Sequence, residues 1–237
     1  MEQQSLEIGG IPALLWGPAQ DFCILAVHGS GSHKADVPVA LLAEEAAPRG
    51  HQVLSFDLPE HGARKGDSPL CNPQTCVPEL RQVLAFARQR AAHVSIWANS
   101  LGAYFSLLAY KNEPLRQALF LSPVVDLERL TRDMMGWFGV SEERLRAERE
   151  IPTPMGETLR WEDYQYVRAN PITRWDVPTA ALYGGRDALC KRAVVTAFAQ
   201  RWGCRLTVCE QAEHYFHTPE DLAAYQSWLR ENLSAAK

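Results

Sequence analysis

Three residues whose side chains can cooperate in nucleophilic catalysis follow separate predicted strands. Ser100 follows the apolar run His93–Ala98, Asp187 comes just after the run Thr179–Tyr183, and His214 lies beyond the last such run. A serine hydroxyl is a weak nucleophile until a base removes its proton, and an acid orients that base. Open α/β sheets place their sites in loops at the carboxyl ends of strands. The pattern therefore favours a serine nucleophile with a histidine base and a carboxylate acid.

Two other residues compete for these roles. Asp126 follows an earlier strand and is the alternative acid, whereas His217 is the alternative base. Asp126 immediately precedes a helical pattern, and an aspartate at that position is well explained as an N-terminal cap. His217 lies beside Thr218, which is the expected cap of the last helix. We therefore prefer Asp187 and His214.

The strands that position these residues are indicated by short apolar runs. The runs are continuous rather than alternating, which is typical of strands buried on both faces of a parallel sheet. The leading stretch Leu6–Trp16 is a candidate hairpin at one edge. The predicted strands are Phe22–His28, Gln52–Leu58, His93–Ala98, Ala118–Ser122, Thr179–Tyr183 and Arg205–Cys209.

Segments with helical periodicity lie between these runs. Leu101, Phe105 and Leu108, for example, share one face of a helix that Ser100 precedes. The last helix opens at 218–221 with Thr-Pro-Glu-Asp, which offers a cap, a proline at the first helical position and an acid at the third. Strands that alternate with helices predict right-handed crossovers and a doubly wound, mostly parallel sheet.

One connection is too long to be a single crossover helix. Residues 123–178 separate two predicted strands and are rich in charge, yet they also carry Met134, Trp137, Phe138 and Trp161. We expect a helical insertion that lies over the sheet edge as a cap within one domain spanning 1–237. Trp137, Phe138 and Trp161 are candidates for lining a substrate pocket, although aromatic residues in an insertion more often only pack it down.

Composition excludes several classes of protein. The chain has 237 residues, of which 46% are hydrophobic and 22% charged, so it resembles an average globular domain. The net charge of −4 provides no basic field for nucleic acid or an anionic membrane. No apolar run is long enough to span a membrane. The polar start of the chain lacks the pattern of a signal peptide, so we expect a cytoplasmic protein with no membrane insertion.

The six cysteines lie at 23, 71, 76, 190, 204 and 209. None forms a Cys-x-x-Cys pair, and no Cys/His spacing indicates zinc. In a reducing compartment free thiols are expected, several of them within strands. We therefore predict no metal.

The segment around Ser100 resembles the α/β-hydrolase family. Residues 97–102 read Trp-Ala-Asn-Ser-Leu-Gly, and the family's nucleophile elbow reads Gly-x-Ser-x-Gly. Gly102 matches, whereas Ala98 replaces the first glycine with another small residue. The family's triad follows the chain order Ser, Asp or Glu, His, as do Ser100, Asp187 and His214. The resemblance implies an α/β-hydrolase fold with these three as the catalytic residues, and it extends from Phe22 to the last helix.

Two further motifs carry the same resemblance. The loop 28–32, His-Gly-Ser-Gly-Ser, is similar to the family's oxyanion loop and implies that the backbone N–H groups of Ser30 and Leu101 form the oxyanion hole. Asp57 and His61 resemble a family turn, Asp-x-Pro-x-His-Gly, and are expected to hold that turn together. Gly-rich loops can also bind phosphate, but the chain lacks both phosphate-loop and dinucleotide signatures. We therefore predict no nucleotide cofactor.

The function implied is hydrolysis of small carboxylic esters through an acyl-enzyme. The same triad would serve a thioesterase, an amidase or peptidase, or an acyltransferase, and these alternatives stay open. A non-catalytic relative that binds a small molecule is the alternative from another class, and it often lacks a triad residue. The expected partner is a small acyl substrate, with no cofactor and no nucleic acid.

Overall fold

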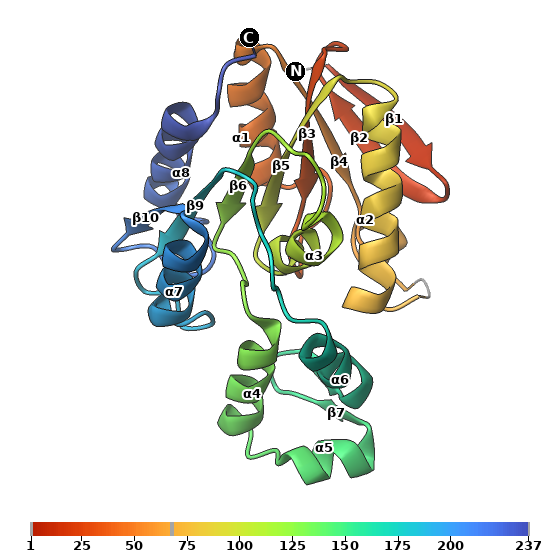
Figure 1. The fold of residues 1–237 in the computed structure, drawn as a ribbon, viewed down its shortest axis with the longest axis vertical. Coiled ribbons are helices and arrows are strands. Elements are labelled where there is room, and N and C mark those ends of the chain that lie inside the picture. The colour runs from red at the N-terminus through yellow and green to blue at the C-terminus, as the bar shows by residue number, and fades with distance from the viewer. Residues whose placement is uncertain (1, 67–68, 237) are drawn as a thin grey trace.

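A computed structural model describes residues 2–66 and 69–236, and these form an eight-stranded sheet with helices on both faces (Figure 1). The strand order is β1-β2-β4-β3-β5-β6-β9-β10. β1 pairs with β2, and β2 with β4, in antiparallel fashion, whereas all the remaining neighbours are parallel. The predicted doubly wound, mostly parallel sheet is confirmed. The strands are β1 (Gln3–Ile8), β2 (Ile11–Trp16), β3 (Phe22–Val27), β4 (His51–Phe56), β5 (His93–Asn99), β6 (Ala118–Leu121), β9 (Thr179–Gly184) and β10 (Arg205–Cys209).

The predicted strands are present, and their ends differ from the prediction by at most two residues. Every residue of β4 and β9 is buried, as continuous apolar runs require of central strands. The edge strand β1 is mostly exposed, and it pairs with β2 through a two-residue glycine turn. The expected hairpin is therefore confirmed, and it begins three residues before Leu6.

Two groups of helices cover the sheet. α1 (Val37–Ala46) and α8 (Pro219–Asn232) pack on one face, whereas α2 (Pro73–Arg88), α3 (Leu101–Tyr110) and α7 (Arg192–Trp202) pack on the other. Short 3-10 helices lie at Ala47–Arg49 and Gly62–Arg64. The predicted start of α8 is confirmed, because Thr218 and Asp221 form a reciprocal capping box.

The segment between β6 and β9 projects beyond one end of the sheet (Figure 1). It contains α4 (Leu127–Trp137), α5 (Glu142–Glu148) and α6 (Trp161–Ala169), which are the expected helices. It also contains an unexpected hairpin, β7 (Glu150–Pro152) with β8 (Thr158–Arg160). The insertion is therefore not purely helical, because the prolines and glycine of 152–156 favour a turn between two short extended segments. We call residues 123–178 the cap.

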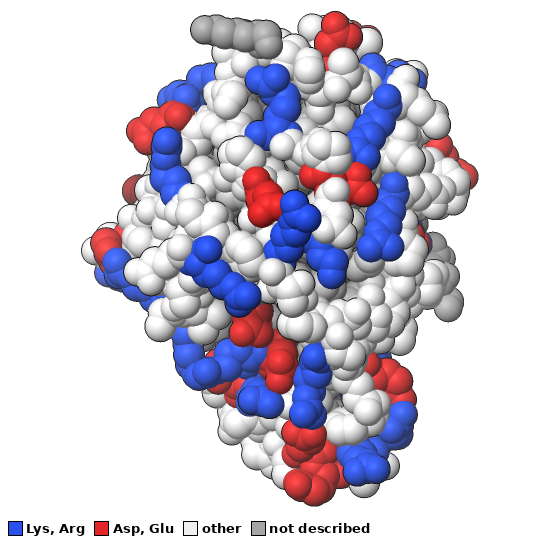
Figure 2. All heavy atoms as spheres, in the orientation of Figure 1, with Lys and Arg blue, Asp and Glu red and all other residues white. Residues whose placement is uncertain are grey.

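Acidic and basic side chains are interspersed on the face drawn in Figure 2, without a large area of one sign. The lower end of that view is the cap, where ion pairs such as Arg144–Glu148 and Arg168–Glu142 lie on the surface. None of the helices in the described ranges combines the length and apolarity needed to cross a membrane. All six cysteines are free thiols.

Candidate active site

Ser100 occupies a tight turn between β5 and α3. Its φ of 49° and ψ of −119° are unusual for a residue with a side chain. The turn is held by hydrogen bonds from Ser100 N–H to Leu121 O (3.0 Å) and from Val124 N–H to Ser100 O (3.0 Å). A Cβ at Gly102 would lie 2.3 Å from the carbonyl oxygen of His28, so the position requires glycine. The turn therefore exposes the Ser100 hydroxyl at the carboxyl end of the sheet.

Asp187 lies in the loop after β9. Two glycines bring that loop against the segment before His214, because a Cβ at Gly184 would lie 2.2 Å from Glu213 O and one at Gly185 only 2.6 Å from Glu210 Cα. Asp187 Oδ1 accepts hydrogen bonds from the backbone N–H groups of Leu189 and Cys190, both at 2.8 Å. These bonds orient the carboxylate, whose side chain is fully buried.

His214 joins the acid to the serine. Its Nδ1 lies 2.7 Å from Asp187 Oδ2, and its Nε2 lies 2.8 Å from Ser100 Oγ. Because a carboxylate only accepts, Nδ1–H donates to Asp187 and Nε2 is free to accept from the serine hydroxyl. The three predicted side chains thus form one continuous hydrogen-bonded chain.

The loop after β3 lies directly beside Ser100. A Cβ at Gly29 would be 2.9 Å from Ser100 Cβ, so glycine allows this approach. Ser30 and Leu101 line the same cavity as Ser100. Within the described ranges, no hydrogen bond uses the backbone N–H of either Ser30 or Leu101. Among the described residues, both N–H groups therefore have no protein acceptor beside the cavity that Ser100 lines.

A buried polar cluster fixes this loop to the turn after β4. Asp57 accepts from the backbone N–H of Lys34 (2.8 Å) and of Ala63 (2.9 Å), and it pairs with the Lys34 ammonium. Burial raises the pKa of Asp57, but these donors outweigh it and hold the pKa below its usual value. His28 Nε2 accepts from Leu58 N–H at 3.0 Å, and burial lowers the pKa of His28 to about 4, so it stays neutral.

The comparisons with known proteins identify the family and the fold. The sequence profile described as the Alpha/beta hydrolase family matches residues 24–227. The chain belongs to the alpha/beta hydrolase family. No curated protein sequence matches it significantly.

Solved structures similar to this alpha/beta hydrolase match it along nearly its whole length. Est1E from Butyrivibrio proteoclasticus, in a structure with ferulic acid bound, has a TM-score of 0.77 at 16% identity and covers 97% of this chain and 99% of its own. Mouse alpha/beta hydrolase domain-containing protein 10 gives 0.77 at 15% identity, with 98% of each chain covered. An esterase of Pyrococcus furiosus gives 0.69 at 18% identity, with 97% of this chain and 89% of its own covered. At these identities the likeness shows a shared fold and nothing more specific.

Asp126 and His217, the alternative acid and base, have other positions in this alpha/beta hydrolase. Asp126 caps α4, because its Oδ1 accepts from Arg129 N–H at 2.9 Å. His217 is exposed, and its Nδ1 contacts the carbonyl of Tyr215. Neither residue lies in the hydrogen-bonded chain of Ser100.

A cavity of about 280 Å³ opens beside Ser100 beneath the cap, and we call it the cap cavity. Its apolar wall comes mainly from α4, through Leu127, Leu130 and Met134, with Phe105 and Leu159 opposite. Thr131, Arg160 and Asp163 add polar groups. Most of these residues were not predicted. The face of α4 was visible as a helical stripe, but the sequence does not show that it borders a cavity.

The three aromatic residues proposed from sequence lie elsewhere. Trp161 is buried among cap residues, with its ring centroid 6.0 Å from that of Tyr164. Phe138 is half-buried just beyond the end of α4, and neither Trp161 nor Phe138 lines the cap cavity. Trp137 is 43% exposed and borders a neighbouring depression that His214 also lines.

A second cavity, of about 250 Å³, is lined by residues 29–32 of the loop after β3, and we call it the loop cavity. Ser100 and His214 border both cavities. The walls of the loop cavity are more polar and include Ser32, Asp36 and His217. Asp36 also caps α1, and Lys34 is held by Asp57, so these residues serve the loop itself. Ser100 therefore stands between two separate spaces.

Asp187, Cys190 and His214 bring three ligand-type atoms within 4.8 Å of one another. Asp187 and His214 already bond each other, and burial raises the pKa of the Cys190 thiol far above its usual value. A protonated thiol is not a metal ligand. Among the described residues, this cluster therefore fits the hydrogen-bonded chain of Ser100 better than a metal centre.

Proposed function

We propose that this protein is a serine hydrolase that cleaves small carboxylic esters through an acyl-enzyme. The observation that supports the proposal is the chain Ser100 Oγ–His214 Nε2 at 2.8 Å and His214 Nδ1–Asp187 Oδ2 at 2.7 Å. Hydrogen-bonded contact between a nucleophile and a base, with the base held by an acid, is the arrangement that activates serine.

In the proposed mechanism, His214 removes the proton from Ser100 as the oxygen attacks the acyl carbon. The backbone N–H groups of Ser30 and Leu101 hold the oxyanion, which typically contributes about 10²–10³ in rate for each donor. His214 then protonates the leaving alcohol. A water molecule attacks the acyl-enzyme with His214 again as the base, and the acid is released. Asp187 stabilises the imidazolium that forms in both steps.

The two cavities suggest how the substrate lies. The cap cavity is mostly apolar and suits the acyl group, whereas the more polar loop cavity suits the leaving group. The volume of the cap cavity, about 280 Å³, lies just below the usual range for ligand pockets. Short aliphatic or single-ring acyl groups therefore suit it best. The ferulic acid bound to Est1E supports the inclusion of hydroxycinnamate esters in a substrate panel.

The decisive experiment is labelling with a fluorophosphonate probe, which reacts with activated serines. We expect one label on Ser100 and hydrolysis of short 4-nitrophenyl esters. Ser100→Ala should abolish both while its circular dichroism and melting temperature stay unchanged. Equal labelling of the variant would refute the proposal. Thioesters and aminoacyl amides in the same panel distinguish the alternative acyl substrates.

A further inference from the structure

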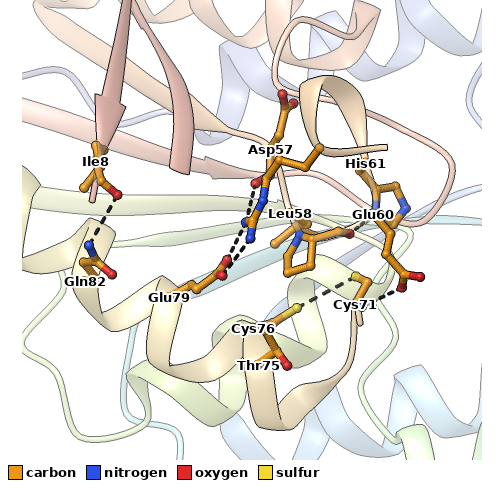
Figure 3. A network of polar contacts seen from close by, with 12 residues as sticks. Ile8, Asp57, Leu58, Glu60, His61, Cys71, Thr75, Cys76, Glu79 and Gln82 are labelled. Carbon is orange, nitrogen blue, oxygen red and sulfur yellow. Dashed lines mark hydrogen bonds and ion pairs between the residues drawn. The ribbon is translucent and has the colours of Figure 1, made fainter. Parts of the chain in front are cut away.

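Two cysteine side chains meet at the start of α2, on the wall of the cap cavity. Cys71 immediately precedes the cap residue Asn72, whose side chain accepts from Thr75 N–H at 3.0 Å. Cys76 lies in the first turn of the helix, and the two Sγ atoms are 3.8 Å apart (Figure 3). A residue just before a cap and one in the first turn often contact each other in this way. This packing at the helix start explains why the two sulfur atoms are close together. It does not account for the cavity and the imidazole beside them.

The two thiols differ in access. Cys71 is partly exposed and lines the cavity that also contains Ser100. Cys76 is fully buried beneath it. A small reagent that enters the cavity therefore meets the Cys71 sulfur first.

The surroundings favour a thiolate at Cys71. The hydrogen bond with Cys76 and then the interaction with His61 lower the pKa of Cys71 to about 6, although burial and the Glu60 carboxylate oppose this. The interaction with Cys71 in turn raises the pKa of His61. Burial, followed by Cys71 itself, raises the pKa of Cys76. Cys76 therefore keeps its proton, and its S–H donates a hydrogen bond to the Cys71 sulfur.

Charged side chains flank the pair, and the Glu157 carboxylate on the wall of the same cavity also raises the pKa of His61. Glu60 accepts from the backbone N–H of Cys71 at 2.7 Å. Arg64 and Glu79 pair with each other at 2.6 Å. Figure 3 shows Glu79 on the same helix as Cys76. His61 Nε2 accepts from Gly31 N–H at 3.1 Å and its Nδ1–H donates to Pro59 O at 2.7 Å, so the imidazole near Cys71 is held against the loop after β3.

We propose that Cys71 and Cys76 are a peroxide-reactive dithiol, with Cys71 as the attacking sulfur and Cys76 as the resolving one. The proposal rests on the 3.8 Å contact, the difference in access and the neighbouring imidazole. It does not depend on the hydrolase activity, because no step uses Ser100.

The chemistry requires a hydroperoxide as the oxidant. The Cys71 thiolate attacks the outer oxygen and the O–O bond breaks. The leaving group is hydroxide from hydrogen peroxide or an alkoxide from an organic hydroperoxide, and it takes a proton from solvent to leave as water or as the alcohol. Cys71 becomes a sulfenic acid, and the negative charge that kept Cys76 protonated disappears. Cys76 then attacks the Cys71 sulfur, the S–O bond breaks, and hydroxide leaves with the Cys76 proton as water. The product is a disulfide, and the two electrons have passed to the peroxide.

The test begins with alkylation of the reduced protein by iodoacetamide at pH 7, followed by peptide mapping. Cys209 is a suitable internal control, because it is also a free and partly exposed thiol. We expect Cys71 to react at least about tenfold faster than Cys209, as a thiolate should. His61→Asn should raise the pH at which Cys71 is half reactive by about one unit.

The second measurement uses hydrogen peroxide. The unmodified chain should yield a Cys71–Cys76 disulfide that dithiothreitol reverses. Cys76→Ser should instead yield a Cys71 sulfenic acid that dimedone traps. The proposal fails if Cys71 reacts no faster than Cys209, or if peroxide oxidises Cys71 without forming the disulfide. Both readouts on the unmodified chain are independent of whether a variant folds.

Discussion

Ser100 shows how strongly the backbone is constrained around the proposed nucleophile. A positive φ at a residue with a side chain is strained, and three neighbours maintain it here: Gly102 beneath, Gly29 beside it and Leu121 through a hydrogen bond. The strain is maintained because the surrounding backbone leaves no room for a relaxed turn. The hydroxyl is thereby presented to His214 at 2.8 Å.

The role of Asp187 can be tested against that of Asp126. Asp187→Asn should reduce turnover by about 10⁴-fold, because an amide favours the wrong imidazole tautomer. Asp126→Asn should leave turnover and melting temperature unchanged, since asparagine caps a helix as well as aspartate does. Steady-state kinetics on both variants decide between the acids. An inactive Asp126 variant with a normal Asp187 variant would reverse the assignment.

At the scale of elements, the site depends on how closely two loops approach. Gly184 and Gly185 let the end of β9 lie against the segment 210–213, and this contact sets the position of both Asp187 and His214. The cap contributes in another way, because one face of α4 forms the wall of the cavity beside Ser100. Loops therefore fix the reactive groups, whereas the cap shapes the space around them.

Gly184→Ala tests the loop contact. Its Cβ would lie 2.2 Å from a backbone oxygen, so the His214 loop must shift. A displacement near 1 Å can cost about 10²-fold in rate, and we expect a loss of that size in kcat/KM. Gly136→Ala is the matched control, because its Cβ would meet nothing within 4 Å. It lies inside α4 and should gain about 1 kcal/mol in stability with unchanged kinetics. Normal kinetics for the Gly184 variant would contradict the prediction.

The cap cavity should control acyl preference through Leu130. Leu130→Phe adds volume to the wall and should lower the kcat/KM ratio of octanoyl to acetyl esters by about tenfold or more. Trp161→Ala is the comparison, because that side chain packs within the cap rather than in the cavity. It should cost about 3–5 kcal/mol of unfolding free energy with unchanged relative rates. The opposite pattern, with preference altered only by the tryptophan, would assign the pocket wall to Trp161.

At the scale of the whole molecule, the sheet brings together groups that are far apart along the chain. Asp57 follows β4, yet it holds the loop after β3 through Lys34 and the turn after β4 through Ala63. Gly62 adopts a φ of 54°, and a Cβ there would lie 2.2 Å from Asp57 Oδ1, so the turn closes around the carboxylate. This cluster couples the stability of the fold to the shape of the oxyanion loop.

The pH dependence of stability should reflect this cluster. The folded state holds the pKa of Asp57 below its usual value. Its charged form therefore stabilises the protein above the unfolded pKa of about 4, and the gain disappears as the pH falls through the lower folded pKa. Asp57→Asn should lose about 2–3 kcal/mol at pH 7, as for hydrogen bonds to a charged group. Urea unfolding from pH 7 to pH 3 should show the two proteins converging. A difference that stays constant with pH would exclude the carboxylate charge as the cause.

The sequence by itself determined the features that depend on neighbouring residues. Continuous apolar runs predicted buried strands, and the pattern at 218–221 predicted the capped start of α8, which the structure confirms. The resemblance to the family's triad order, with Ser100, Asp187 and His214 each following a different parallel strand, predicted that they meet, because parallel strands end at one edge. The structure brings these side chains into contact.

Only the tertiary structure decided which surfaces face each other. The stripe Leu127, Leu130 and Met134 was visible in the sequence, but its position beside Ser100 depends on how the cap folds over the sheet. The contact of His61 with both Cys71 and Gly31 likewise joins three separate segments. Periodicity along the chain shows which face of a helix is apolar. It does not show what that face meets, because the partner is set by the packing of elements distant in sequence.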